Sequence, residues 1–237
     1  MTLPPILDPL PHAPLHQLAA AAIAEAILGG RLRPGDKIPE GELSTQLNIS
    51  RIPLREAIRI LEQHGLAEVR PKKGTYVRKI SAGEAGDGLR LRRALEDLAL
   101  QQAMERLDGD QWHALCGRLE AGICRMRALL SEPDAMLAIN AGGAKLDVEF
   151  HTILVDASGN RLLRQVWTNV AWLTRLMWRE VTGLRTPAQY EENIQGHLDL
   201  LAVLRRRLPG ECRQALAAHI GKGVDMPPTE GPDSAAD

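Results

Sequence analysis

Residues 50–77 read SRIPLREAIRILEQHGLAEVRPKKGTYV, and this stretch predicts a helix followed by a short β-hairpin. Ser50 is a natural N-cap residue whose hydroxyl can accept a hydrogen bond from the first helical turn, and Gly65 ends the helical pattern. The apolar residues between them recur at helical spacing and form one stripe: Leu54, Ala57, Ile58 and Leu61. The segment therefore predicts an amphipathic helix, with hairpin strands over 66–70 and 75–79.

A second stripe on the same helix is cationic. Arg51, Arg55 and Arg59 follow one another at four-residue spacing and so share a face. Residues 51–79 contain eight Lys or Arg against three Glu. Upstream, residues 39–49 predict a shorter helix that ends in a left-handed turn at Asn48. Two helices joined by a tight turn, followed by a basic hairpin, indicate a winged helix-turn-helix rather than an ordinary solvated helix face.

These features resemble the GntR family of bacterial transcription regulators over about residues 15–80. The matching runs are ILGGRLRPGDKI at 27–38, SRIPLREA at 50–57 and LEQHGL at 61–66, with Gly74 in the wing. Gly41 departs from the family pattern where Arg is common, and Ile52 where a small hydroxylated residue is usual. The resemblance implies that double-stranded DNA is bound through eight residues: Ser50, Arg51, Ile52, Arg55, Arg59, Lys72, Lys73 and Gly74.

The composition favours helices and an uneven division of charge. Of 237 residues, 44% are hydrophobic but only one is Phe and two are Tyr, so Leu, Ala and Ile must fill the core. Residues 1–80 carry 11 basic and 8 acidic side chains, whereas the rest of the chain is acidic. A basic N-terminal segment is typical of a domain that binds DNA. The three cysteines form no CxxC pair, and we find no signal peptide or membrane-length apolar run, so we expect a cytoplasmic protein without membrane contact.

The second half shows helical periodicity throughout. We expect six helices, broken near Gly or Pro residues, over 83–106, 109–131, 134–157, 160–182, 187–207 and 210–221. Short connections between long helices predict an antiparallel bundle. The expected fold is thus mainly α, with a winged helix-turn-helix and a C-terminal six-helix bundle. The predicted divisions are a disordered arm (1–14), the winged domain (15–80), a linker (81–87), the bundle (88–222) and a disordered tail (223–237).

Four polar residues interrupt the apolar stripes of the bundle. Asp147 and His151 lie one helical turn apart, while His197 and His219 each stand among apolar neighbours. Burying such a group without a partner costs about 1–3 kcal/mol. A Zn, Ni or Mn ion would satisfy all four. Hydrogen-bonded core histidines are the alternative, and the residue types alone leave both open.

The bundle also resembles the FCD effector domain of the FadR branch of GntR regulators, in its shorter, VanR-like form. The family run D-x-x-F-H corresponds to DVEFH at 147–151, with further family histidines at His197 and His219. The resemblance implies one divalent transition metal per chain, held by Asp147, His151, His197 and His219. Arg92, in the run RRALE at 92–96, matches a family Arg near the effector cavity, although an exposed pair with Glu96 fits the spacing equally well.

These observations predict a transcription regulator, and not an enzyme, that represses from a homodimer bound to a palindromic operator. A small carboxylate effector would bind at the metal in the bundle and alter DNA affinity. Two alternatives stay open at this point. One is a metal-dependent hydrolase whose open site activates water, and the other is an architectural DNA-binding protein whose bundle is purely structural.

Overall fold

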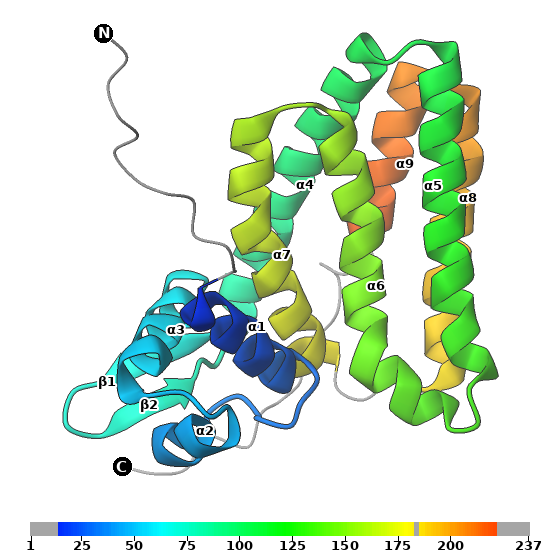
Figure 1. Cartoon of the computed structure of the whole chain (residues 1–237). Helices are drawn as coiled ribbons and strands as arrows, with labels where there is room; N and C mark the ends of the chain where they lie inside the picture. Colours follow the sequence, from blue (N-terminus) through cyan, green and yellow to red (C-terminus); the bar gives the residue numbers. More distant parts are fainter. Residues whose placement is uncertain (1–13, 183–184, 222–237) are drawn as a thin grey trace, which may run out of the picture. The chain divides into compact units, whose positions relative to one another are not determined.

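The computed structural model describes residues 14–182 and 185–221, and the chain divides into two units. One unit extends to Ile27 and continues over Arg31–Arg78, while the other combines Leu28–Gly30 with the chain from Lys79 onward. Figure 1 follows both units along the sequence. Apart from Pro14, the expected disordered arm (1–14) and tail (223–237) lie outside the described residues.

The described part of the first unit consists of three helices and an antiparallel hairpin: α1 (Leu15–Leu28), α2 (Glu40–Gln46), α3 (Arg51–Gln63), β1 (Ala67–Arg70) and β2 (Gly74–Val77). The predicted helix-turn-helix and wing are confirmed, with boundaries shifted by a few residues. Asn48 (φ 51°) and Gly65 (φ 71°) adopt the left-handed conformation that ends α2 and α3. In the hairpin, Ala67 pairs with Val77 and Arg70 pairs with Gly74.

The start of α3 corrects one detail of the sequence analysis. Ser50 occupies the N-cap position in extended backbone, but its side chain makes no capping hydrogen bond. An N-cap hydroxyl ordinarily accepts from the amide of the second or third helical residue. Here the third helical residue is Pro53, which has no N–H to donate. The predicted apolar stripe from Leu54 to Leu61 is buried as expected.

The second unit contains six α-helices and a short 3₁₀ segment within the described residues. They are α4 (Ala82–Arg106), α5 (Gly109–Ala128), the 3₁₀ turn (Leu129–Ser131), α6 (Ala135–Ala157), α7 (Arg161–Thr182), α8 (Pro187–Arg206) and α9 (Pro209–Gly221). The predicted six-helix bundle is confirmed. α4 packs against α6, α7 and α9, while α5 packs against α6 and α8 (Figure 1). None of the described helices combines the length and apolar character needed to cross a membrane.

Residues 82–87, which we expected both in the linker (81–87) and, from residue 83, in the first bundle helix (83–106), form the first turns of α4. Ser81 and Glu84 explain the difference. The Ser81 hydroxyl accepts from the Glu84 amide at 3.2 Å, and the Glu84 carboxylate accepts from the Ser81 amide at 3.0 Å. This capping box satisfies free amides at the helix start, so the helix begins before Gly83 and Gly86 despite their low helix propensity.

Candidate functional site

The cationic face of α3 is solvent-exposed over its whole length. Arg51, Arg55 and Arg59 are all exposed, and the Ile52 side chain beside them is 76% exposed. Arg59 is held by Glu56 at 2.9 Å, whereas Arg51 and Arg55 have no ion pair within the described residues. Two guanidinium groups are therefore available at the N-terminal half of the helix, where a recognition helix contacts base edges.

The turn of the β1–β2 hairpin carries two further exposed cations and is supported by a side-chain hydrogen bond. Lys72 and Lys73 are exposed, and Lys72 adopts a left-handed backbone conformation (φ 61°). Gly74 has φ 107°, a conformation in which L side chains are strained. The Tyr76 hydroxyl donates to the Lys73 carbonyl at 3.3 Å, and the Arg70 guanidinium lies 4.3 Å from the Tyr76 ring centroid. Tyr76 thus supports the turn, a role that the sequence analysis missed.

In the second unit, three of the four predicted metal ligands converge. His151 on α6, His197 on α8 and His219 on α9 place one ring nitrogen each within 4.8 Å of one another. His151 and His197 are fully buried, and His219 is partly buried. Asp147 lies beside this cluster, with its Oδ1 atom 3.3 Å from His197 Nε2. Residues from three separate helices therefore form one polar centre inside a largely apolar core.

Hydrogen bonds set the orientation of two of these rings. His151 Nδ1 donates to Glu96 Oε2 at 2.6 Å, and His197 Nδ1 donates to the backbone carbonyl of Asn193 at 2.8 Å. Both acceptors lack a proton, so in a neutral ring the proton belongs to Nδ1 and the lone pair to Nε2. His219 Nε2 lies 3.3 Å from His151 Nε2. The Nε2 atoms are thus directed into the cluster, as a metal site requires.

The cluster fits a bound metal ion on its own geometry. Two ligands held by one ion at about 2.0–2.1 Å are separated by about 3.0–3.4 Å, which matches the two Nε2 atoms of His151 and His219. His197 Nε2 and Asp147 Oδ2 are buried and have no hydrogen-bond partner. Buried polar atoms without a hydrogen bond are unfavourable, and a cation among them would satisfy both.

Arg92 and Glu96 are part of this centre. Their side chains are 4% and 0% exposed, so the alternative of an exposed helix pair is wrong. Arg92 Nε donates to Glu96 Oε1 at 2.7 Å, and Arg92 Nη2 lies 3.6 Å from Asp147 Oδ2. Sequence reasoning missed the role of Glu96 in orienting His151. The available signal was its spacing to the apolar residues that follow on α4, Ala99 and Ala103, which marks an inward face.

The charges of the centre favour ligation at neutral pH. Burial alone would raise the pKa of Glu96, but His151 and Arg92 outweigh it and lower that pKa. Burial likewise opposes ionisation of Asp147, yet His197 and Arg92 lower its pKa. Burial lowers the pKa of both His151 and His219, and the positive charge of Arg92 adds to this effect, while the nearby carboxylates partly offset it. Ionised carboxylates and neutral imidazoles are the forms that bind metals.

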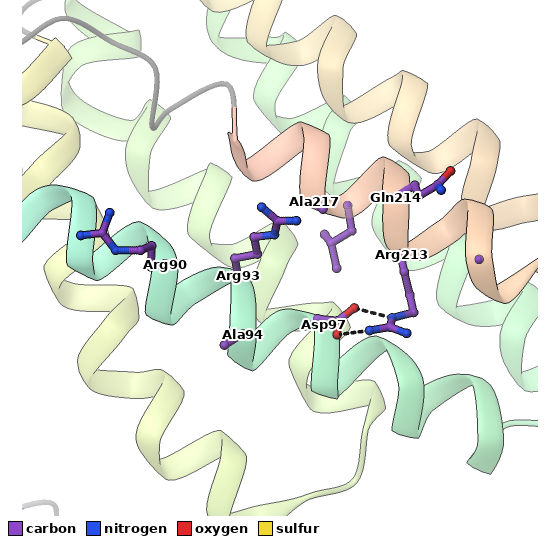
Figure 2. A pocket seen from close by; sticks show the side chains of 9 residues that line it. Arg90, Arg93, Ala94, Asp97, Arg213, Gln214 and Ala217 are labelled. Carbon is purple, nitrogen blue, oxygen red and sulfur yellow. Dashed lines mark hydrogen bonds and ion pairs between the residues drawn. The ribbon is translucent and has the colours of Figure 1, made fainter.

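A different, solvent-facing hollow of about 530 Å³ lies along α4 and α9 (Figure 2). Its polar lining consists of Arg90, Arg93, Asp97, Arg213 and Gln214. Arg213 binds Asp97 through Nε and Nη2, each at 2.7 Å, and Arg90 pairs with Asp87 at 2.5 Å. α4 and α9 also carry Glu96 and His219, so a test of anion binding to the unit must separate this hollow from the buried centre.

Comparison with known proteins supports the assignment of both units. Residues 15–77 match the model of the family described as bacterial regulatory proteins, gntR family, and residues 87–222 match the FCD domain. The Nta operon transcriptional regulator of Aminobacter aminovorans is 33% identical over 82% of this chain and 85% of its own length. The HTH-type transcriptional repressor RspR of Escherichia coli is 26% identical over 89% of this chain and 87% of its own length.

Solved structures agree on the fold. Escherichia coli McbR superimposes with a TM-score of 0.74 over 90% of this chain and 96% of its own, at 20% identity. A GntR-type structure from Rhodococcus gives a TM-score of 0.70. The matched families and relatives are transcriptional regulators and not enzymes, which removes the hydrolase alternative. With a helix-turn-helix unit and an FCD unit in this order, the chain belongs to the GntR family of bacterial transcriptional regulators.

Proposed function

We propose that this regulator is a metal-containing repressor that acts as a homodimer on a palindromic operator and responds to a small carboxylate. The observation that carries the proposal is the buried cluster in which one ring nitrogen each of His151, His197 and His219 lies within 4.8 Å of the others, with Asp147 Oδ1 3.3 Å from His197 Nε2. A purely structural core would place apolar side chains there, because partly satisfied buried polar groups destabilise a fold. A Zn, Ni or Mn ion held by these four residues would supply a Lewis-acid site with positions left for an effector carboxylate.

The proposed contacts to DNA follow from exposure and pairing. Arg51 and Arg55, which lack ion pairs in the described chain, would bind base edges, since an Arg fork fits guanine O6 and N7. Arg59, already paired with Glu56, is better suited to a phosphate. Ser50 and Gly74 have small side chains and would allow close approach of the backbone at the helix start and wing, and the exposed Ile52 side chain would make an apolar contact to DNA. Lys72 and Lys73 would meet phosphates or the minor groove.

Exposed apolar side chains on the bundle support a homodimer. Leu91 and Leu98 on α4 are 46% and 43% exposed, while Leu162 and Val166 on α7 are 74% and 47% exposed. α4 and α7 pack against each other. A second copy of the chain would cover these side chains from water. Two-fold symmetry of such a dimer would then require a palindromic operator.

Within the proposed effector site, Arg92 already makes two contacts. Its Nε atom binds Glu96 and its Nη2 atom faces Asp147. A guanidinium has five donors, so Arg92 keeps N–H groups for an effector while it holds these carboxylates in place. We therefore retain Arg92 as an effector contact and add that it fixes the metal-side carboxylate of Asp147.

Metal content tests the cluster directly. The purified protein should contain about one transition-metal ion per chain, and His151→Ala and His197→Ala should each lose most of it. His113→Ala is the matched control, because His113 is exposed on α5 and should not change the metal content. Elemental analysis that finds no metal after reconstitution, or equal metal in all variants, would contradict the proposal.

The link between the two units requires a separate experiment. Operator titrations with and without acetate or succinate, on metal-loaded wild type and His219→Ala, should show a coupling of about 1–3 kcal/mol in the wild type only. The variant should still bind the operator, because the helix-turn-helix has its own buried core. An equal response from both proteins would show that the metal does not sense the ligand. No response from either would favour a purely structural bundle.

A further inference from the structure

We propose that Lys37 is a third cation of the wing and contacts a DNA phosphate together with Lys72 and Lys73. Lys37 belongs to the connection between α1 and α2, so α2 and α3 separate it in sequence from the hairpin. This proposal rests on the proposed function, in which the two hairpin lysines meet DNA. Tertiary contacts, and not sequence proximity, assign Lys37 to the same surface.

Backbone pairing holds the segment around Lys37 along the edge of β2 that does not face β1. Lys37 forms an antiparallel bridge with Tyr76. Three backbone hydrogen bonds join the two segments: Gly35 N–H to the Val77 carbonyl at 2.9 Å, Val77 N–H to the Asp36 carbonyl at 2.8 Å, and Ile38 N–H to the Thr75 carbonyl at 2.8 Å. Ile38 is buried and Lys37 is exposed, as expected for neighbours in extended backbone.

A side-chain hydrogen bond fixes the same segment at its far end. The Thr75 hydroxyl in β2 donates to Glu40 Oε1 at 2.8 Å, and Glu40 is the first residue of α2. Thr75 is buried, so this bond is shielded from water. The position of Lys37 beside β2 is therefore determined by contacts on both sides of it.

The Lys37 side chain reaches the turn of the hairpin. A Cβ atom at position 74 would lie 3.0 Å from Lys37 Cε and 3.6 Å from Lys37 Nζ. Gly74 therefore leaves the space beside which the end of the lysine chain lies. Since Gly74 directly follows Lys73, the Lys37 ammonium group lies next to the turn that carries the two hairpin lysines.

These three lysines lack a counter-charge. Lys37, Lys72 and Lys73 are exposed, and none of them takes part in an ion pair among the residues that the structure describes. Arg70 on the same hairpin differs, because its Nε atom donates to Glu68 Oε1 at 2.6 Å. Like charges that are grouped without a carboxylate attract an external polyanion. Double-stranded DNA is such a polyanion, with one phosphate charge for about every 1.7 Å of its axis.

A lysine at the edge of a sheet has one other ordinary role. Its charge can prevent the edge from pairing with another chain, and this role needs no contact with DNA. The two roles differ in their dependence on salt. A phosphate contact releases counterions, so its loss makes the slope of log K against log salt shallower by about 0.9. An edge charge that does not meet DNA leaves this slope unchanged.

Two substitutions of Lys37 test the contact in the full-length protein. Lys37→Met removes the charge and keeps an aliphatic chain, whereas Lys37→Arg keeps the charge. Lys37→Met should weaken binding to a selected operator and to a scrambled duplex alike. Its loss of affinity should be about three- to fourfold smaller at about 200 mM salt than at about 50 mM, which corresponds to one phosphate contact. Lys37→Arg should keep the slope of the wild type.

Lys145→Met is the matched control for net charge. Lys145 is an exposed lysine on α6 in the helical unit, and its removal should leave the slope unchanged. Circular dichroism during thermal unfolding should give the same melting temperature for Lys37→Met and wild type, because the substitution removes an exposed ammonium group and leaves the backbone pairing intact. A loss of DNA affinity in Lys37→Met then reports on binding and not on folding.

Lys73→Ala separates the possible failures. If Lys73→Ala makes the slope shallower and Lys37→Met does not, Lys37 is only an edge charge, and the third contact is wrong while the proposed wing contact stands. If neither variant changes the slope, the wing does not meet phosphates and both proposals fail. Equal losses of affinity in Lys37→Met and Lys37→Arg would also overturn the phosphate contact, because the second variant keeps the charge.

Discussion

The two units of this regulator place their charged groups in opposite ways. In the helix-turn-helix unit, the arginines of α3 and the lysines of the wing are exposed, and Thr75 is the buried polar residue among those described. In the helical unit the buried polar residues include five ionisable ones: Arg92, Glu96, Asp147, His151 and His197. Exposed cations suit a large polyanion that approaches from solvent. Buried charges suit a small ion or ligand that is enclosed, because burying charge without a partner is costly.

The comparison therefore predicts two kinds of mutational effect. A charge removed from the exposed face should change binding and leave stability almost unchanged, whereas a charge removed from the buried centre should change stability first. All four tryptophans of the chain lie in the helical unit, at 112, 167, 172 and 178. Their fluorescence during urea unfolding therefore reports on that unit alone.

The largest effect is expected from Arg92→Met. The substitution leaves Glu96 and Asp147 without their buried counter-ion, and breaking such a network costs about 3–5 kcal/mol. Tryptophan fluorescence in urea, on metal-free protein, measures the loss. Arg93→Met is the matched control, because the neighbouring Arg93 is exposed and its removal should change the free energy of unfolding by less than about 0.5 kcal/mol. Equal losses in the two variants would show that the buried network does not stabilise the unit.

Arg55→Ala should give the opposite result. Loss of an unpaired, exposed guanidinium from α3 should weaken binding to a selected operator by about 1–3 kcal/mol and relax its sequence preference. The urea midpoint of the tryptophan signal should stay that of the wild type. Fluorescence anisotropy with the operator and a scrambled duplex measures both the operator affinity and the sequence preference. Wild-type operator affinity in this variant would overturn the assignment of α3 as the recognition helix.

A smaller effect is expected from Lys73→Ala in the wing. A phosphate contact carries no sequence information, so binding to operator and scrambled DNA should weaken alike. The slope of log K against log salt should become shallower by about 1. Titrations at several salt concentrations measure this slope. A loss confined to the operator would instead place Lys73 against bases.

The smallest effects concern the two serine N-caps. Ser81→Ala removes a capping bond to Glu84 and should destabilise the helical unit by about 1 kcal/mol. Ser50→Ala removes no capping bond and should change stability by less than about 0.5 kcal/mol, although it can still affect DNA binding. Tryptophan fluorescence measures the first variant, and circular dichroism during thermal unfolding measures the second. A loss for Ser50→Ala as large as that for Ser81→Ala would show that the hydroxyl caps α3 in solution.

The sequence alone determined the secondary structure and the residue types of the candidate metal site. Helical periodicity, with breaks at Gly and Pro, placed the six bundle helices because apolar spacing and helix breakers are local signals. The left-handed residues Asn48 and Gly65 were predictable for the same reason. Two local predictions were wrong. The Ser50 side chain does not cap α3, because Pro53 has no amide to donate. Residues 82–87 are helical and not a linker, because the capping box of Ser81 and Glu84 outweighs the low helix propensity of the glycines.

Only the tertiary structure decided which polar groups meet. Glu96 and His151 are 55 residues apart, and His151 and His219 are 68 apart, so no local pattern can report their contact. Packing of α4, α6, α8 and α9 buries these side chains together, and burial converts Arg92 and Glu96 from an ordinary helix pair into the support of a proposed metal centre. The contact between Lys37 and the wing also exists only after folding, because α2 and α3 separate the two segments in sequence and pairing with β2 brings them together.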